Sequence, residues 1–559
     1  MIGKFLSFKT KTVGRAAFLL AVFSLLSKVL GLLRDNLLAN LFPKEITDAY
    51  FAAFRIPDFV YAIVIGGGVT AAFLPVFAES FKKSRKDAQK LSGSIFVFFS
   101  VFLFFISILL FIFAGPLVKI IAPGFSASQH TLTVSLTRLM FLSPIFLGLS
   151  VILTSVLQFF NIFLATALAP LFYNLGIIFG ILFFAPVFGP RGLAFGVILG
   201  AFLHLFIQIF PFVKLGFSFK PNFDLRIPGL KKFFLLIGPR IISSATSQLN
   251  LIVLTAIAST LPSGALSIFV FSDNIQSIPT GLIGIPFATA IFPLLSWLSA
   301  KGDKESFSQN FSAVFCYLLF LIVPLSVFFF LLRAQIVRLI LGTSFVGEGL
   351  FGWEQTRLVA ASLGIFSFSL FAVSLIPFLT KVFFSRHNTV IPLKITFVAV
   401  VFNIILCFLL TRLLSFPNFF RQAVSAFFKL KGISGITVLG LPLAVSISTI
   451  FQFFLLLIWL KKEAGDLNYR FIWSCFKKIA AAAFLMFVFV FVSLKGFAAL
   501  FSLKTVVGVF FQTALSGIVA VVSYLYFCRL LGLREAEALI SLIRKIKKIK
   551  LNLSHFPFS

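Results

Sequence analysis

Long apolar runs, separated by short polar and charged segments, recur along the whole chain. Many reach about 20 residues, which as a helix is long enough to cross the ~30 Å hydrocarbon core of a bilayer. The strands of a transmembrane barrel would instead alternate apolar and polar residues over about ten residues each, and these runs are continuous. The pattern therefore predicts an all-α polytopic membrane protein.

The polar interruptions divide the pattern into about fourteen transmembrane helices. Their expected ranges are 16–41, 50–80, 92–114, 131–158, 160–186, 191–213, 233–261, 264–299, 311–332, 355–384, 388–414, 433–460, 474–494 and 505–531. Between the eleventh and twelfth spans, the segment 412–431 combines phenylalanine with arginine and lysine. We expect it to form an amphipathic interfacial helix or a long loop.

Similar sequences occur at corresponding places in two halves of the chain. TRLMFLSPIFLGLS (137–150) resembles TRLVAASLGIFSFS (356–369), and TAAFLPVFAES (70–80) resembles TAIFPLLSWLS (289–299). Spans 1–6 and 7–12 therefore read as two six-helix repeats. An even number of helices makes the copies parallel, an arrangement that places a transporter's substrate site near the membrane midplane.

This repeat predicts four parts of the chain. They are an N-lobe (1–214), a C-lobe (215–463) that includes the 412–431 insert, a pair of C-terminal helices (464–531), and a basic cytoplasmic tail (532–559).

Composition and charge support the membrane assignment. Only 11% of the residues are charged, against about 25% in soluble domains. The net charge of +32 comes mainly from lysines and arginines in alternate loops, which is the positive-inside pattern rather than a nucleic-acid-binding surface. With the N-terminus inside, the basic loops include 82–90, 214–232, 381–386 and 461–478, and both termini are expected in the cytoplasm.

Motifs of soluble enzymes are absent from the sequence. There is no P-loop, GxGxxG, HExxH or GxSxG, and the four histidines do not cluster. The cysteines (Cys316, Cys407, Cys475 and Cys528) have no metal-binding spacing and are interpreted as small apolar residues without disulfides. We expect no enzymatic activity, no bound cofactor and no metal site.

Charged residues inside the predicted spans are the strongest functional signal. Lys28, Arg34 and Asp35 lie within or at the end of the first span, where each charge costs about 2.5–3.5 kcal/mol unless it faces protein or water. Lys28, Gly31 and Asp35 share one helical face. The alternative is that the cations extend to the membrane surface. Asp48 lies just before the second predicted span.

Other polar residues occur at positions related by the repeat. Arg240 opens the seventh span, and Asp273 and Asn274 lie inside the eighth. Arg55 and Arg138 are secondary candidates, Arg138 being either an interfacial anchor or a functional residue. Cations that face a cavity favour an anionic cargo, because arginine pairs with phosphate through a bidentate fork. With 83 phenylalanines available to face lipid, a phosphorylated lipid would fit.

Glycine and proline interrupt two spans that correspond in the repeat. Gly66, Gly67 and Gly68 break the second span; Pro279, Gly284 and Pro286 break the eighth. Broken helices at matching repeat positions often mark a transporter's site or moving parts, although helix packing explains some glycines. We interpret these breaks as gates or hinges.

The sequence resembles the MurJ (MviN) family of lipid II flippases, in the MATE-like (MOP) exporter superfamily. The resemblance lies in SKVLGLLRD (27–35), TDAYFAAFRIPD (47–58), TAAFLPVFAE (70–79), APGF (122–125), ALAPLFYNLGII (167–178), PSGALSIFVFSDNIQSIPTGLIGIPFATAIFPLLS (262–296) and FFSRHNTVIPLKI (383–395). It implies flipping of an undecaprenyl-pyrophosphate-linked peptidoglycan precursor from the inner to the outer leaflet. It also implies that the two C-terminal helices form a groove for the lipid tail.

The resemblance implies substrate-binding roles for several of these residues. Lys28 stands where the family usually has a cavity arginine, and Arg34, Asp35 and Asp48 match the family pattern. In the family an arginine usually follows the aspartate of the eighth span, whereas Asn274 follows Asp273 here. Arg240 would supply a cation from another helix. Some members of the family have a sodium site. Spans 11 and 12 of this chain contain no acidic residue that could belong to such a site.

The combined prediction is a lipid II flippase of the bacterial inner membrane that works by alternating access. Coupling to the membrane potential or to a monovalent cation is expected, and membrane lipids and cell-wall synthesis proteins are expected partners. Alternatives are a flippase for another polyprenyl-linked oligosaccharide, a MATE-type cation-coupled exporter, and a non-transporting scaffold of cell-wall synthesis.

Overall fold

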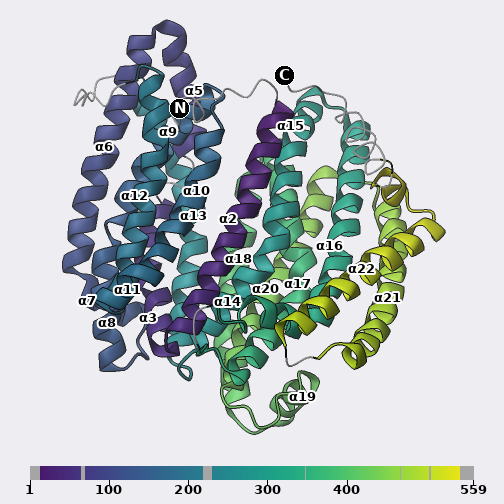
Figure 1. Ribbon diagram of the computed structural model, residues 1–559. Coiled ribbons are helices and arrows are strands. Elements are labelled where there is room, and N and C mark those ends of the chain that lie inside the picture. Colours follow the sequence, from purple (N-terminus) through teal and green to yellow (C-terminus); the bar gives the residue numbers. More distant parts are fainter. Residues whose placement is uncertain are drawn as a thin grey trace, which may run out of the picture. The chain divides into compact units, whose positions relative to one another are not determined.

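The computed structural model describes residues 13–63, 69–217, 229–345, 348–465, 467–502, 505–539 and 541. Throughout this part of the chain the regular elements are helices, and no strand is present (Figure 1). The helices are α2 (Val13–Leu41), α3 (Lys44–Ala53), α4 (Arg55–Tyr61), α5 (Val69–Lys83), α6 (Arg85–Ile112), α7 (Ala114–Ile121), α8 (Ala127–Met140), α9 (Ser143–Phe159), α10 (Leu164–Phe179), α11 (Ala185–Phe188), α12 (Arg191–Lys214), α13 (Leu230–Ser259), α14 (Ala265–Pro279), α15 (Ile285–Lys301), α16 (Lys304–Ile340), α17 (Trp353–Ser385), α18 (Val390–Ser415), α19 (Phe419–Phe427), α20 (Gly440–Ala464), α21 (Tyr469–Leu500) and α22 (Val506–Leu530).

The all-α membrane architecture is confirmed. Eleven helical segments among the described residues are long and apolar enough to span a bilayer. Each matches one of the predicted spans. The other three predicted spans fall on α2, on the run α3–α5 and on α13. Residues 64–68 of the run α3–α5, and some side chains of α2 and α13, are outside the description. The predicted spans 131–158 and 160–186 are separated by a turn between α9 and α10, in which Asn161 adopts a positive φ of 59°.

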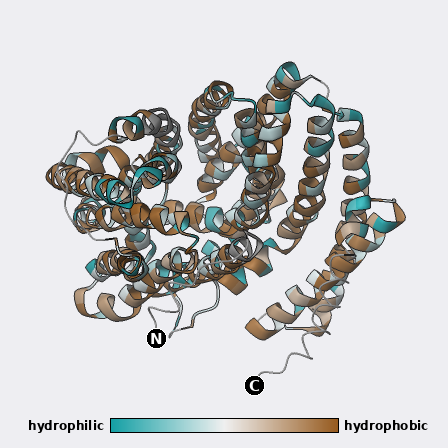
Figure 2. Ribbon diagram, turned by 90° about the horizontal axis from the view of Figure 1, so that it is seen from above, coloured by the Kyte–Doolittle hydropathy of each residue, from teal (hydrophilic) through white to brown (hydrophobic). Residues whose placement is uncertain are grey.

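Helix surfaces in this protein are largely apolar, as Figure 2 shows by the brown colour along most helices. Large apolar side chains remain exposed on many of them, such as Phe105 on α6, Phe183 after α10 and Phe408 on α18. An exposed apolar surface of this extent suits contact with lipid chains rather than water. Some of the phenylalanines predicted to face lipid therefore lie on the outer surface of the protein.

Clustering of the chain's contacts gives two compact units. Unit 1 comprises residues 1–271, 340–355 and 404–441, and unit 2 comprises residues 272–339, 356–403 and 442–559. The predicted N-lobe falls within unit 1, and the predicted C-terminal helix pair falls within unit 2. The four-part division expected from the sequence remains a prediction.

Small residues set the packing at the centre of unit 1. Gly176 on α10 and Gly180, directly after α10, face Gly200 and Gly196 on α12, and a Cβ added to Gly176 would lie 2.4 Å from the Gly200 backbone. Close approach of this kind is typical of helix pairs in membranes, where packing replaces the hydrophobic effect as the driving force. It holds α10 against α12 while the other side of α10 contacts α2.

Aromatic residues fill the core of unit 2. Phe311 and Phe315 of α16 pack against Phe378 of α17, with the Phe311 and Phe378 rings 5.4 Å apart. Phe453 of α20 joins the same cluster.

Outside the spans, Asp303 accepts a hydrogen bond from the Ser306 backbone amide at the start of α16. This bond lowers the pKa of the Asp303 carboxyl and fixes where the helix begins.

The predicted insert between spans 11 and 12 contains a helix, α19. Asn418 caps its start by accepting the Arg421 amide, and none of its residues is buried. Phe419 is 84% exposed. The interfacial location of this helix remains a prediction.

Candidate functional site

Charged and polar side chains gather inside unit 1 where α2, α3, α4 and α10 meet. Arg34 on α2 donates from Nε and Nη2 to Asp35 Oδ1, at 3.1 and 2.8 Å. Asp35 is 2% exposed, whereas the Arg34 side chain keeps 20% of its surface accessible. An ion pair of this kind is costly to bury unless its remaining hydrogen-bonding groups are satisfied.

Asn174 on α10 provides further polar contacts for this ion pair. Its Oδ1 accepts from Arg34 Nη1 at 3.5 Å, and its Nδ2 donates to the Ser27 carbonyl and hydroxyl at 3.2 and 3.1 Å. A Cβ on Gly31 would lie 4.0 Å from Asn174 Oδ1, so the predicted Lys28, Gly31 and Asp35 face of α2 is directed at α10. Lys28 is partly buried on this face of α2.

Helices α3 and α4 add an aromatic and a second acidic residue. Asp58 interacts electrostatically with both Arg55 and Arg34. Arg55 also donates from Nε to Thr255 Oγ1 on α13 at 2.7 Å. The Tyr50 hydroxyl is buried beside Arg34 and has no hydrogen-bond partner in the described part of the chain. Such a buried hydroxyl is available to a polar ligand.

The sequence prediction missed three members of this cluster: Tyr50, Tyr173 and Asn174. Each occurs in a motif that resembles the family, and Asn174 is a polar residue within an otherwise apolar run. The isolated polar position of Asn174 was therefore the one feature of the sequence that could have indicated its place in the cluster. Tyr173 interacts with Arg34 through space, which periodicity alone does not reveal.

Asp48 lies in unit 1 but makes different contacts. It is 3% exposed, and its Oδ2 accepts from the Gly264 amide at 2.7 Å while its Oδ1 accepts from the Ser267 amide at 2.8 Å and from the Ser267 hydroxyl. The carboxylate thus caps the N-terminus of α14, where negative charge is favourable. Direct substrate contact by Asp48 remains a prediction.

We expect Asp48→Asn to lower the free energy of unfolding by about 1–3 kcal/mol, because hydrogen bonds to a charged group are lost and an amide replaces one acceptor. The apparent melting temperature of the purified protein in detergent measures this. Glu45→Gln is the matched control, since Glu45 bonds the exposed Ser263 at 2.9 Å and its replacement should be nearly neutral. Equal melting temperatures for both variants would contradict the capping role.

The predicted eighth span forms one helical segment, Ala265–Lys301, which contains an irregular turn in unit 2 where the sequence predicts a break. Between α14 and α15, residues Thr280–Gly284 form a π-helical turn, a feature that often marks functional sites. A Cβ on Gly284 would lie 2.5 Å from the Ser374 carbonyl oxygen, and the Thr280 and Ser374 hydroxyls are 3.0 Å apart. Pro279 and Pro286 flank the turn. Its role as a gate remains a prediction, and Gly66, Gly67 and Gly68 fall outside the described residues.

The remaining predicted residues are distributed as follows. Asp273 and Asn274 belong to unit 2, where Asp273 accepts from Gln276 Nε2 at 2.9 Å. Arg240 lies on α13, and its side chain is outside the described part of the structure. Arg138 is exposed on α8 and donates to the Phe111 carbonyl at 3.3 Å, with its guanidinium 5.2 Å from the Phe111 ring centre. That placement favours an anchoring role for Arg138.

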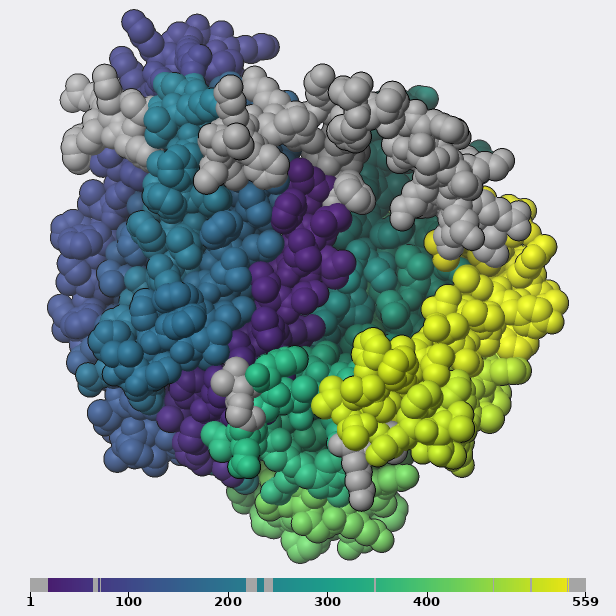
Figure 3. Space-filling model, in the orientation of Figure 1, coloured from purple at the N-terminus to yellow at the C-terminus, as the bar shows by residue number. Residues whose placement is uncertain are grey.

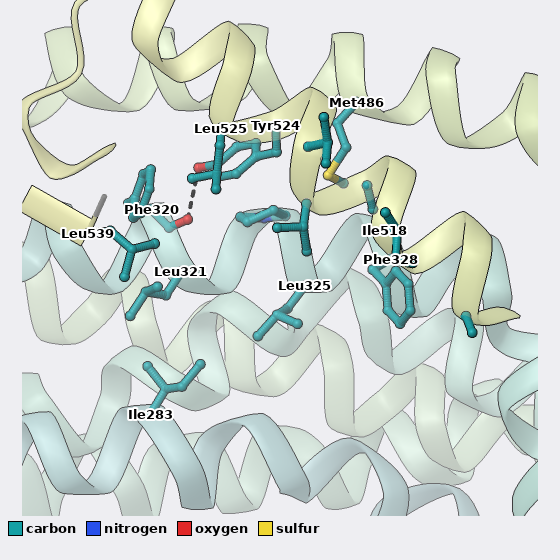
Figure 4. Close-up of a pocket in the computed structure, with 16 residues that line it drawn as sticks. Ile283, Phe320, Leu321, Leu325, Phe328, Met486, Ile518, Tyr524, Leu525 and Leu539 are labelled. Carbon is teal, nitrogen blue, oxygen red and sulfur yellow. Dashed lines mark hydrogen bonds between the residues drawn. The ribbon is translucent and has the colours of Figure 1, made fainter. Parts of the chain in front are cut away.

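An apolar groove of about 660 Å³ lies in unit 2. Leu321, Leu325 and Phe328 of α16 form one wall, and Ile518 and residues near it on α22 form another (Figure 4). Figure 3 shows α22, in yellow, on the surface of the molecule. The Tyr524 hydroxyl donates to the Phe320 carbonyl at 2.8 Å and joins the two helices at one end of the groove.

Solved structures of membrane transporters have a similar fold. A structure of "Lipid II flippase MurJ, inward closed conformation" aligns with a TM-score of 0.71 at 22% identity, over 92% of this chain and 98% of that one. An inward-facing multidrug-resistance MATE family transporter of the MOP superfamily aligns with a TM-score of 0.64 at 12% identity, over 81% of this chain and 99% of that one. The fold and the long apolar helices together define a multi-pass membrane protein with a MATE-like fold.

Sequence comparisons identify the family within this class. The family model "Lipid II flippase MurJ" matches residues 37–516. A probable lipid II flippase MurJ from Buchnera aphidicola subsp. Acyrthosiphon pisum is 28% identical over 92% of this chain and 96% of its own length. Another from Rhizobium tropici is 32% identical over 70% of this chain and 74% of its own length. The chain therefore belongs to the MurJ lipid II flippase family, as the sequence motifs predicted.

Proposed function

We propose that this chain flips lipid II from the inner to the outer leaflet of the bacterial cytoplasmic membrane by alternating access. It moves a lipid without converting it, and is a transporter rather than an enzyme. Membership of the MurJ family supports the proposal. The observation that carries it is the Arg34 cluster, a set of charged groups buried in a bundle whose other helices are apolar.

The pyrophosphate head would bind to Arg34 and Lys28, with Arg240 supplying a third cation. The partly exposed guanidinium of Arg34 can offer a bidentate fork to a phosphate. Asp35 and Asp58 lower the net positive charge near Arg34. This balance would limit the affinity for the head so that the lipid can leave on the other side, since a transporter that binds too tightly cannot release its cargo.

The apolar groove of unit 2 would hold the polyprenyl tail. Lipid chains are about as apolar as leucine, so moving a tail from the bilayer into the groove brings little net hydrophobic free energy. The groove would therefore orient the lipid, and selectivity would come from the polar head.

The membrane potential, or a monovalent cation, would reset the carrier. Each unit charge that crosses the full membrane field changes the free energy by about 2.3 kcal/mol per 100 mV. A site with three cations and two carboxylates keeps a net positive charge when empty, and a bound pyrophosphate reverses its sign. An inside-negative potential would then draw the empty site back toward the cytoplasm.

Membrane lipids and enzymes of cell-wall synthesis are the proposed partners, with both termini in the cytoplasm. The basic loops between alternate spans support this topology. A flippase for another polyprenyl-linked oligosaccharide would use the same cations, because the pyrophosphate is common to both lipids.

Replacement of the resident lipid II flippase in a depleted bacterium tests the proposal. We expect the chain to restore growth and prevent lysis when it is expressed at a level verified by immunoblot. A well-expressed, membrane-localised chain that fails to restore growth would contradict the proposal, as would rescue only of a strain lacking a flippase for a different glycan.

A further inference from the structure

Three residues with metal-binding side chains meet in the core of unit 2. They are Cys316 on α16, Cys475 on α21 and Glu535 in the helical segment 534–539 that follows α22. Their ligand atoms all lie within 4.8 Å of one another, and the Cys475 thiol donates to Glu535 Oε1 at 3.7 Å. The residues are 159 and 60 positions apart, so no motif in the sequence could signal the group.

Glu535 is the unusual member of this group. It is only 6% exposed, and among the residues that the structure describes no lysine or arginine lies within ion-pairing distance of its carboxylate. A buried carboxylate without a cation is costly, and a thiol is a weak hydrogen-bond donor that offsets little of the cost. Packing of small apolar residues accounts for the two cysteines but leaves this carboxylate unexplained.

We propose that Cys316, Cys475 and Glu535 bind a divalent, thiophilic metal ion of the Zn²⁺ type. Zinc prefers four ligands in a tetrahedron, with bonds of about 2.3 Å to sulfur and 2.0–2.2 Å to carboxylate oxygen, which places ligand atoms roughly 3.4–3.8 Å apart. The distance from Cys475 Sγ to Glu535 Oε1 already lies in that range. The other separations need a contraction of no more than about 1.4 Å, within the reach of side-chain rotation.

Cys528 on α22 is buried nearby but is not one of the three residues whose ligand atoms meet. A water molecule would therefore supply the fourth ligand of the tetrahedron. Binding converts the Cys316 and Cys475 thiols to thiolates and releases about two protons to solvent, without any oxidant or reductant.

The proposed metal site adjoins the apolar groove. Cys316 precedes Phe320 by one helical turn, and Glu535 precedes Leu539 by one turn; Phe320 and Leu539 both line the groove. A bound metal ion would cross-link α16, α21 and the segment after α22. The site would thereby fix the end of the groove at which the Tyr524–Phe320 hydrogen bond lies.

Zinc titration of the purified full-length protein tests this site independently of transport. Bound metal is first removed with a chelator, the chelator is removed, and Zn²⁺ is added back. We then expect one Zn²⁺ per chain by elemental analysis, and competition with a chromophoric chelator should give its affinity. Cys316→Ser, Cys475→Ser and Glu535→Gln should each weaken binding at least about tenfold. Cys407→Ser is the matched control, because Cys407 is a buried cysteine on α18 outside this group and its loss should leave zinc binding unchanged.

A second measurement avoids variants that fail to fold. In the wild-type protein, zinc should slow alkylation of Cys316 and Cys475 and leave alkylation of Cys407 unaffected, as read by mass spectrometry. Zinc content far below one per chain with no protection of either thiol would overturn the proposal. A Cys316–Cys475 pair that reacts only after reduction would also overturn it, since the pair would then be a disulfide.

Discussion

Arg34→Ala is expected to abolish rescue of a flippase-depleted bacterium and to reduce lipid II in the outer leaflet at least tenfold. The substitution removes the guanidinium that we propose binds the pyrophosphate, and charge-assisted hydrogen bonds to such a group contribute about 1.5–3 kcal/mol each. Growth of the depleted strain and accessibility of lipid II to an outside probe measure the result.

The same substitution leaves the buried Asp35 without its cation, which can cost about 3–5 kcal/mol of stability. The double variant Arg34→Gln/Asp35→Asn separates folding from binding, because it removes both charges and keeps polar side chains of similar size. We expect it to be expressed and folded but inactive. Arg138→Ala, which removes an exposed arginine bound to Phe111, should remain active. Full activity of the double variant would exclude Arg34 from the substrate site.

Gly517→Leu is expected to lower the flipping rate on the order of tenfold by filling part of the apolar groove. Gly517 lines the groove on α22, opposite Phe328 of α16. Additional side-chain volume in a packed apolar site typically costs about 1–3 kcal/mol, and here the tail would bear that cost. The rate at which lipid II appears in the outer leaflet after expression is restored measures the effect.

Gly517→Ala serves as the control for this prediction. A Cβ at this position would lie 3.6 Å from the nearest Phe328 ring atom, which is an ordinary van der Waals contact, so alanine should fit without displacing anything. We expect its rate to match the wild type. Leucine and alanine variants with the same wild-type rate would show that the tail does not use this part of the groove.

Much of the fold is predictable from the sequence because membrane helices leave a simple signal. Apolar length alone identifies segments such as α6 and α12. The proline and glycine residues between Pro279 and Pro286 coincide with a π-helical turn in an otherwise continuous helical segment. The helical face shared by Lys28 and Asp35 follows from the 3.6-residue period. These features depend on neighbours along one helix, which the sequence contains directly.

Contacts between distant helices were not predictable in the same way. The sequence does not predict that the Asp48 carboxylate caps α14, more than 200 residues away, and the substrate-binding role expected for Asp48 stays a prediction. Asn174 joins the Arg34 cluster because α10 packs against α2, and Tyr50 joins it from α3; a linear pattern specifies neither contact. Cys316, Cys475 and Glu535 likewise come together only through the packing of three helical segments.

The most direct test of the central claim is the amount of lipid II in the outer leaflet of a depletion strain that carries this chain as its only flippase. Lipid II is labelled or cleaved from outside the cytoplasmic membrane and quantified against total lipid II. We predict restoration to the level given by the native flippase, with loss in the folded Arg34→Gln/Asp35→Asn variant. Unchanged accumulation of lipid II in the inner leaflet, despite normal expression of the wild-type chain, would contradict the account.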